Sequence, residues 1–426
     1  MTLPRFKTFA LSALMLGAVG TATAPLWAQQ TSETRGIQLN LGVTLGLETQ
    51  SNRALDPADP GRSSAATMGL SLGVLSETRT QRLSFDLGGD LRNLNGPGNV
   101  INGFVNPSIA LGYDRTSAAA RLSLSASLRE INRASEGLIF DEDAQTFTLV
   151  DGTATRRRTN LSAQLNWRDD APLGFGVLAR LDDNSYSDGV ATGIDGAVLN
   201  GTQRLTLGAT ARLDLSEASR LNIGLDYSEF KQDGVAGSRD TWTLTNALTI
   251  DRPDGALTFS FAVTDTEDGT RVATSVGRSL EYPLGILSGQ IGVTRGVTGE
   301  TFLSGGVNVT RALPRGNLSF GLARNVNSGT LQDTERVSTR ATFGYQHELN
   351  ALSSLSFDVN WTEVTQTNTN VDTVRASIGA TYSRELTPDW NMDTGIRHRF
   401  RDSSVSGTAR SNELFLNLRR NFLTRF

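Results

Sequence analysis

The stretch RLTLGATARLDL, residues 204–215, alternates between apolar and other side chains along its whole length. One set is Leu205, Leu207, Ala209, Ala211, Leu213 and Leu215, and the other includes Thr206, Gly208, Thr210, Arg212 and Asp214. Alternation with a period of two places the two sets on opposite faces of a β-strand, whereas the 3.6-residue period of a helix would mix them. The stretch therefore predicts a strand with one apolar face and one polar face.

The same alternation recurs through most of the chain, for example in LSFDVNW (355–361) and ALTFSFAVT (256–264). We expect about 20 such strands, within a range of roughly 18 to 22. The connections alternate between short ones such as DRPDGA (251–256) and longer ones such as TQSNRALDPADPGRSSAA (49–66). An even number of amphipathic strands joined in this way is typical of an outer-membrane β-barrel. A β-sandwich of this length would need two or more domains, and no linker divides the chain.

The N-terminal region has the layout of a secretory signal peptide. Arg5 and Lys7 form a basic start, the apolar stretch 9–19 follows, and small residues lead to Ala28. The apolar stretch is shorter than the roughly 20 residues that a membrane-spanning helix needs. We therefore expect residues 1–28 to be a signal peptide and residues 29–426 to form a single barrel domain.

The composition excludes several classes of function. The chain contains no Cys, 20% charged residues and a net charge of −4, so it shows neither a disulfide framework nor a bias toward nucleic acid. No spacing of ligands predicts a metal or another cofactor. His347 and His398 share the parity of apolar neighbours, so neither is placed to act inside the barrel. We therefore expect no enzyme.

The chain ends with ELFLNLRRNFLTRF, residues 413–426, an amphipathic run whose last residue is aromatic. Together with the signal peptide and the amphipathic strands, this end resembles the Gram-negative outer-membrane β-barrel superfamily, and more closely its porin-like members. The resemblance implies an all-β, antiparallel, up-and-down transmembrane barrel in the outer membrane, surrounded by lipid and lipopolysaccharide. Short turns and both termini would be periplasmic, and Phe422 and Phe426 would form the signal that the barrel-assembly machinery recognises.

In a membrane barrel the apolar parity faces lipid and the polar parity faces a water-filled lumen. The longest connection, residues 131–156, is an outer loop that folds back into the lumen in the porins that the chain resembles. Its acidic residues, which would form the constriction, are Asp141, Glu142, Asp143 and Asp151. The other interpretation is an outer loop exposed to solvent.

A basic wall would face this loop. The arginines that the parity places on the lumen side are Arg121, Arg129, Arg158, Arg168, Arg180, Arg212, Arg340, Arg375, Arg397, Arg399 and Arg401. Rings of charged side chains are the usual source of ion preference in a pore. Arg278, Arg311, Arg324 and Arg420 fall on the lipid parity instead, and we expect them near strand ends, where arginine costs about 0–1 kcal/mol.

These observations predict a porin-like channel for passive diffusion of small hydrophilic solutes. Arg outnumbers Asp and Glu on the lumen parity, which hints at a preference for anions. Two alternatives stay open: an accessory barrel that exports polysaccharide or another polymer, and a structural barrel plugged by its own loops. A homotrimer would accompany the porin, and a monomer the export barrel.

Overall fold

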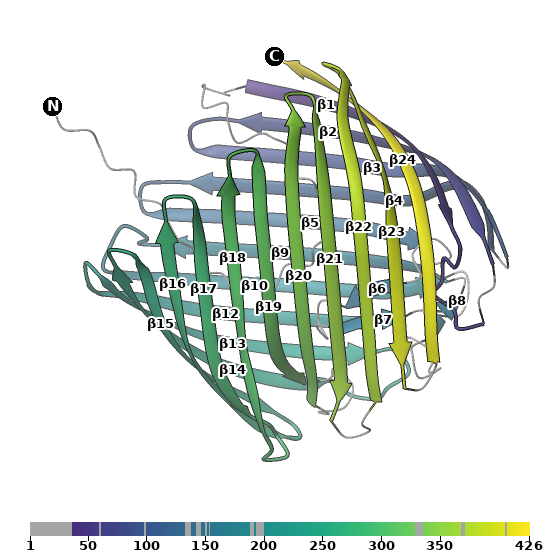
Figure 1. Ribbon diagram of the computed structural model, residues 1–426. Coiled ribbons are helices and arrows are strands. Elements are labelled where there is room, and N and C mark those ends of the chain that lie inside the picture. Colours follow the sequence, from purple (N-terminus) through teal and green to yellow (C-terminus); the bar gives the residue numbers. More distant parts are fainter. Residues whose placement is uncertain are drawn as a thin grey trace. The chain divides into compact units, whose positions relative to one another are not determined.

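The computed structural model describes residues 36–426 except 59–60, 98, 133–137, 142–145, 150, 153, 188–190, 193–199, 329–334, 368–370 and 405–406. These residues form one sheet of 20 antiparallel strands that closes on itself (Figure 1). The predicted fold class and strand number are confirmed. In Figure 1 the strands at the front cross those at the back, because the strands of a closed barrel tilt against its axis. The predicted signal peptide, residues 1–28, lies outside the described residues.

The barrel strands follow one another in chain order. They are β1 (Gly36–Gln50), β2 (Ser63–Glu77), β3 (Gln81–Gly96), β4 (Asn99–Thr116), β5 (Ala120–Asn132), β9 (Thr155–Trp167), β10 (Leu173–Ser187), β12 (Thr202–Ser216), β13 (Ser219–Gln232), β14 (Arg239–Arg252), β15 (Gly255–Thr266), β16 (Gly269–Tyr282), β17 (Gly285–Arg295), β18 (Thr301–Leu313), β19 (Gly316–Ser328), β20 (Glu335–Asn350), β21 (Ser353–Gln366), β22 (Val371–Thr387), β23 (Trp390–Ser403) and β24 (Gly407–Arg425). Two small pairs lie in the loops, formed by β6 (Leu138–Asp141) with β7 (Thr146–Leu149) and by β8 (Asp151–Gly152) with β11 (Ala191–Thr192). No helix in the described part is long and apolar enough to cross a membrane.

The first and last strands close the barrel. β1 and β24 pair in register from Gln38 opposite Arg425 to Gln50 opposite Glu413. The Phe426 N–H also donates to the Ile37 carbonyl at 2.8 Å, so the pairing reaches the last residue of the chain. Lipid cannot satisfy the open edge of a sheet, so this pairing is what allows the sheet to stand in a membrane.

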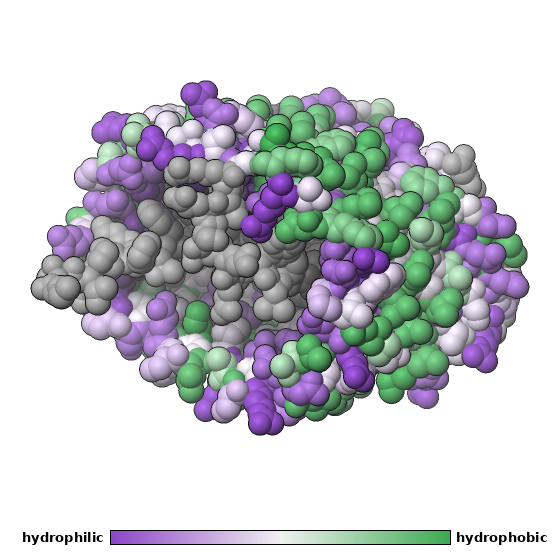
Figure 2. Space-filling model, turned by 90° about the horizontal axis from the view of Figure 1, so that it is seen from above, coloured by the Kyte–Doolittle hydropathy of each residue, from purple (hydrophilic) through white to green (hydrophobic). Residues whose placement is uncertain are grey.

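The outer face of the barrel is apolar. Exposed side chains on this face include Leu41, Leu45, Leu207, Phe259, Phe357 and Phe422. Figure 2 shows hydrophobic residues in continuous areas of the surface, interrupted by hydrophilic ones. Such a surface would be a liability in water, but it is the surface that a bilayer requires.

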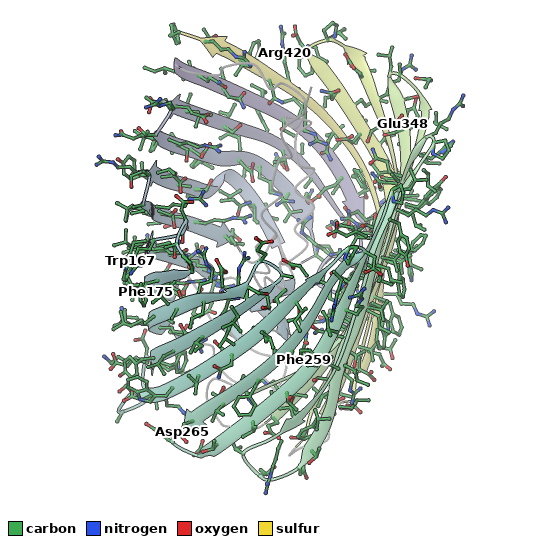
Figure 3. The ribbon with its side chains drawn as sticks, turned by 90° about the vertical axis from the view of Figure 1, so that its left-hand side faces the viewer. Trp167, Phe175, Phe259, Asp265, Glu348 and Arg420 are labelled. Atoms are coloured by element: carbon green, nitrogen blue, oxygen red, sulfur yellow. The ribbon has the colours of Figure 1, made fainter. Side chains whose placement is uncertain are left out.

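Aromatic pairs mark the two margins of this apolar face. Trp167 and Phe175 stack with ring centroids 5.6 Å apart beside the turn that joins their strands, and Figure 3 shows them together at the edge of the barrel. Tyr227 and Trp242 lie 4.9 Å apart near the opposite ends of β13 and β14. Aromatic girdles of this kind lie at the two interfaces of outer-membrane barrels.

Both ends of the barrel chain lie at the same end of the molecule as the turn at 78–80, since Gly36 pairs with Glu77 and Phe426 pairs with Ile37. The opposite end carries the longer connections but also short ones, such as residues 267–268 between β15 and β16. Several loops are shorter than the sequence predicted. The sequence NLNGPGNVINGF, residues 93–104, predicts a longer outer loop, but β3 runs to Gly96 and β4 begins at Asn99. Residues 131–132 and 155–156 likewise belong to the barrel wall, because strand pairing extends beyond the alternating pattern.

Two of the arginines on the lipid parity lie beside short turns, as predicted. Arg278 forms an ion pair with Asp254 at 2.5 Å, and this partner lowers the pKa of the Asp254 carboxyl. Arg420 pairs with Asp389 at 3.3 Å and lies over the Phe422 ring, 4.3 Å from its centroid. The turn acids and the aromatic ring therefore hold these cations at the margin of the apolar face.

Candidate functional site: the inner wall of the barrel

The strand register assigns the inner face directly, because directly opposed residues of neighbouring strands point to the same side. Ser288 of β17 lies opposite Asn308 of β18, which in turn lies opposite Gly321 of β19. The inner face of these three strands carries uncharged side chains, including Ser288, Gln290, Thr294, Ser304, Asn308, Asn317 and Ser319. This part of the inner wall is neutral and mostly polar, with Ile286 and Phe302 as large apolar exceptions.

One row of the inner wall is strongly basic. Arg340 of β20 lies opposite Thr362, Thr362 lies opposite Arg375, and Arg375 lies opposite Arg401 of β23. Ala323 precedes Arg340 in this row, and Ala409 follows Arg401. The row from Ala323 to Ala409 therefore contains three arginines and no carboxylate. Arg340 and Arg375 are thereby placed on the inner face, as the sequence predicted.

Several inner-face carboxylates lie flat against the wall. The Asp358 side chain lies over Gly379, and the Asp226 side chain lies over Gly208, at distances that leave no room for a Cβ on either glycine. Asp86 has the same relation to Gly73 across β2 and β3. A glycine on the neighbouring strand therefore gives each carboxylate a place beside the backbone instead of in the lumen.

A second group of charges lies on β9 and β10. Asp182 is 3% exposed and forms an ion pair with Arg180 at 2.7 Å, while Arg158 is 3.9 Å from the same carboxylate. Beside them, Arg156 donates to Asn184 Oδ1 at 2.6 and 3.0 Å. Two predicted arginines, Arg158 and Arg180, thus share one buried carboxylate that the sequence did not single out.

The remaining predicted arginines of the first half divide between wall and turn. Arg121 and Arg129 lie on β5 opposite Asn166 and Arg158. Arg212 donates to the Asp169 and Ala171 carbonyls, so it fastens the turn after β9. Arg168 lies in that turn with φ of 59°, not in the strand wall where the alternation placed it, because β9 ends at Trp167.

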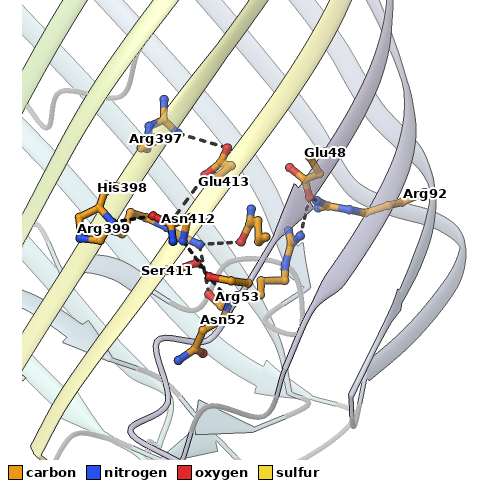
Figure 4. A network of polar contacts seen from close by, with 12 residues as sticks. Glu48, Asn52, Arg53, Arg92, Arg397, His398, Arg399, Ser411, Asn412 and Glu413 are labelled. Carbon is orange, nitrogen blue, oxygen red and sulfur yellow. Dashed lines mark hydrogen bonds and ion pairs between the residues drawn. The ribbon is translucent and has the colours of Figure 1, made fainter.

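The inner face of β23 and β24 carries a polar network, drawn in Figure 4. Arg397 lies 3.6 Å from Glu413, and Arg399 lies 4.0 Å from the other oxygen of the same carboxylate. Arg399 also donates to Gln50 Oε1 at 2.5 Å. Across the closure of the barrel, Arg53 and Arg92 both bind Glu48. The predicted basic stripe on β23 is therefore bound to neighbouring polar groups.

The connection between β1 and β2, residues 51–62, joins this network. Arg401 donates to the Leu55 carbonyl at 3.2 Å, and Arg399 donates to the Arg53 carbonyl at 3.4 Å. The Asn52 N–H donates to Ser411 Oγ on β24 at 3.3 Å. Since Arg399, Arg401 and Ser411 all lie on the inner face, this loop covers the inner wall. The sequence indicated an ordinary outer loop, and nothing in its composition marks its direction.

None of the four predicted constriction residues has a side chain that the structure describes. Asp141 ends β6 and Asp151 begins β8, whereas Glu142 and Asp143 lie outside the described residues. The pairing of β8 with β11 connects the loop before β9 to the loop after β10. The inward fold of residues 131–156 stays a prediction.

Both histidines lie on the outer face. Tyr345 Oη lies 3.2 Å from His347 Nδ1, and His398 Nδ1 lies 2.7 Å from Asn412 Oδ1. Neither contact includes a hydroxyl nucleophile or a carboxylate on the lumen side. Within the described part of the chain, no group of three or more His, Asp or Glu side chains could hold a metal ion.

No family model and no curated protein matches this chain. Its fold is similar to solved structures at low sequence identity. The siderophore receptor PirA from Pseudomonas aeruginosa is 10% identical with a TM-score of 0.53, over 92% of this chain and 82% of that one. A mutant of the ferric enterobactin receptor PfeA from Pseudomonas aeruginosa is 10% identical with a TM-score of 0.52, over 91% and 80%.

A further similar structure is OccK9 (OpdG) from Pseudomonas aeruginosa, 13% identical with a TM-score of 0.45, over 91% of this chain and 98% of that one. The fold assignment itself stands on the closed sheet of 20 strands, the apolar outer face and the two receptor structures. The described residues of this chain have the fold of the Gram-negative outer-membrane β-barrels.

Proposed function

We propose that the protein is an outer-membrane channel for passive diffusion of small hydrophilic solutes, with a preference for anions. The observation that carries the proposal is Arg340, which stays partly exposed on the inner wall of β20, in a row with Arg375 and Arg401, which are 8% and 1% exposed. Positive side chains along a low-dielectric wall raise the local concentration of anions. The carboxylates folded over glycines support the same sign of selectivity.

The rest of the wall supports the hydrophilic class of solute. Hydroxyl and amide side chains on β17, β18 and β19, such as Ser288 and Asn308, hydrogen-bond to water and to polar solutes alike. Removing water from such an inner face would cost free energy, because each polar group without a hydrogen-bond partner would lose its hydration. The proposal gives His347 and His398 no catalytic role.

The selectivity is tested by the reversal potential of single channels in a KCl gradient. We expect anion selectivity, and we expect Arg340→Gln to lower it. Arg311→Gln is the matched control, because Arg311 lies on the outer face opposite Leu318 and Gly285 and should leave the potential unchanged. Clear cation selectivity of the unaltered protein would contradict the anion preference.

Size and assembly need separate measurements. Liposome swelling with sugars of graded size would give the cutoff for neutral solutes. A heat-sensitive trimer on SDS gels would support the porin-like form, and a monomer would favour the polymer-export alternative. The proposed orientation places both termini in the periplasm, which cysteine labelling near Phe426 and at Val235 from outside the cell would test.

One observation favours a second candidate, the structural barrel plugged by its own loops. The segment 52–55 is bound to Ser411 and Arg401 of the inner wall, where it takes up space in the lumen. A conductance near zero in reconstituted bilayers, with no sugar passing into liposomes, would support the plugged barrel over the channel.

A further inference from the structure

The first residues of the connection between β1 and β2 are fastened to the inner wall through Asn52, Arg53 and Leu55. Its first residue, Ser51, continues the β1–β24 ladder through two hydrogen bonds of 2.9 Å with the backbone of Asn412. Asn52 then donates to Ser411, and the Arg53 and Leu55 carbonyls accept from Arg399 and Arg401. These wall residues belong to the two C-terminal strands, so the loop crosses the seam where the barrel closes.

The loop is also braced from within. The Asn52 side chain donates to the Asp56 carbonyl at 2.7 Å and accepts from the Asp56 N–H at 3.0 Å. Leu55 takes a φ of 52° and its N–H donates to the Asn52 carbonyl at 3.3 Å. A non-glycine residue with positive φ persists only where its surroundings hold it. The segment 52–56 is therefore a fixed turn.

Burial shows how closely this turn meets the wall. Leu55 and Asn52 are each 1% exposed, and so is Arg401. Arg53 extends the contact to the other side of the seam, because it binds Glu48, which Arg92 of β3 also binds. An arginine is buried at a net gain only where carbonyls or carboxylates accept its donors. The wall arginines and the loop carbonyls thus depend on each other.

We propose that the segment 51–56 forms a fixed constriction of the channel, and that Arg399 and Arg401 are the residues that position it. This inference rests on the proposed channel function. A layer of chain packed on a sheet occupies roughly 10 Å, which the lumen loses on this side. Arg399 and Arg401 then set the size of the solutes that pass, because they hold the loop against the wall.

The position of the loop can be tested without any conductance, because the chain contains no Cys. Leu55→Cys in outer-membrane vesicles should react with a soluble maleimide roughly ten-fold more slowly than Val235→Cys, since only transient opening exposes residue 55. Val235 is 57% exposed in the loop after β13 and serves as the open reference. Adding Arg399→Met and Arg401→Met should raise the rate at residue 55 toward the reference. Equal rates in the unaltered background would overturn the proposal.

The consequence for transport is measured in planar bilayers and by liposome swelling. The double variant Arg399→Met/Arg401→Met should raise single-channel conductance by roughly 1.5- to 2-fold, since the loop would leave about 10 Å of space, and should admit larger sugars. Arg410→Met is the control: it removes one charge from β24, but on the outer face, where its guanidinium lies over the Phe400 ring, so conductance should not change. An unchanged conductance and sugar cutoff in the double variant would refute the constriction.

Two further measurements distinguish a released loop from a variant that has not folded. Asn52→Ala weakens the turn without altering the barrel wall and should increase both labelling at residue 55 and sugar cutoff, even where the arginine variants assemble poorly. Heat-modifiable migration on SDS gels reports whether each variant has folded. A further outcome is that the unaltered protein shows no conductance, although Cys at position 55 reacts slowly and reacts faster in the variants. That result would contradict the channel proposal but support the role of the arginines in positioning the loop.

Discussion

Arg401 and Leu55 lie 346 positions apart in the sequence, yet the guanidinium of Arg401 donates to the Leu55 carbonyl at 3.2 Å, and both residues are 1% exposed. The contact joins the second to last strand of the barrel to its first loop. The hydrogen bond gives the carbonyl and the guanidinium a partner at a place where both are removed from water. The stability of this end of the barrel should therefore depend on the pair.

Arg401→Met should lower the free energy of unfolding by about 1.5–3 kcal/mol, the usual contribution of a hydrogen bond to a charged group. Urea unfolding in lipid vesicles, followed by tryptophan fluorescence, measures the change. Arg410→Met on β24 is the control, because Arg410 lies on the outer face over the Phe400 ring. A loss equal to that of the control would contradict the role assigned to the buried contact.

Asp182→Asn should destabilise the barrel by about 3–5 kcal/mol, since it leaves Arg158 and Arg180 close together around a neutral, buried amide. The same change should shift the reversal potential toward anions. Asp183→Asn, one position along on the outer face, should alter neither quantity beyond about 0.5 kcal/mol. If the two variants behaved alike, the buried carboxylate would not be the group that balances these arginines.

Two glycines should respond differently to alanine. Gly316 begins β19 with φ of 148°, and a Cβ there would overlap the Gln346 carbonyl, so Gly316→Ala should cost about 1–3 kcal/mol. A Cβ on Gly379 would meet only the Asp358 carboxylate, the end of a side chain that can rotate. Gly379→Ala should therefore change stability little and instead move the carboxylate into the lumen, lowering anion preference. Urea unfolding and reversal potentials separate the two effects.

Deleting Phe426 should reduce the amount of protein assembled in the outer membrane. Its N–H closes the ladder to Ile37, and its ring, 78% exposed, has no packing role within the described barrel. Heat-modifiable protein in outer-membrane fractions measures assembly. Phe320→Ala, which removes another exposed aromatic ring from the outer face of β19, should leave assembly near normal. Equal assembly with and without Phe426 would argue against the C-terminal signal.

The fold follows from features that are local in the sequence. Alternation such as that of residues 204–215 assigns each strand and each face, because the side-chain period of a strand is two. Antiparallel strands joined by short turns pair with their chain neighbours, and a sheet with an apolar outer face must close. The same parity placed Arg340, Arg375 and Arg399 on the inner face, where the structure has them.

Loop ends and turn residues were harder to predict. The alternation continued through Arg168, but the chain turns there, so a residue expected in the wall lies beyond it. Strand pairing likewise extended β5 to Asn132 and β3 to Gly96, because hydrogen bonds to a neighbouring strand can order residues without clear alternation. The preference of a residue for a strand depends on its local sequence, whereas strand pairing depends on the residues of the neighbouring strand.

The sequence by itself determined the strands, their faces and the closure of the barrel, since period, turn chemistry and the cost of an open edge in lipid act over short stretches of chain. Only the tertiary structure decided which residues of distant strands and loops contact one another. Glu48 with Arg53 and Arg92, Asp182 with Arg180, and Leu55 with Arg401 are pairs set by register and by the direction of a loop. The physical reason is that the carbonyls of Arg53 and Leu55 meet their donors on β23, at the opposite end of the chain, so no local stretch of sequence contains both partners.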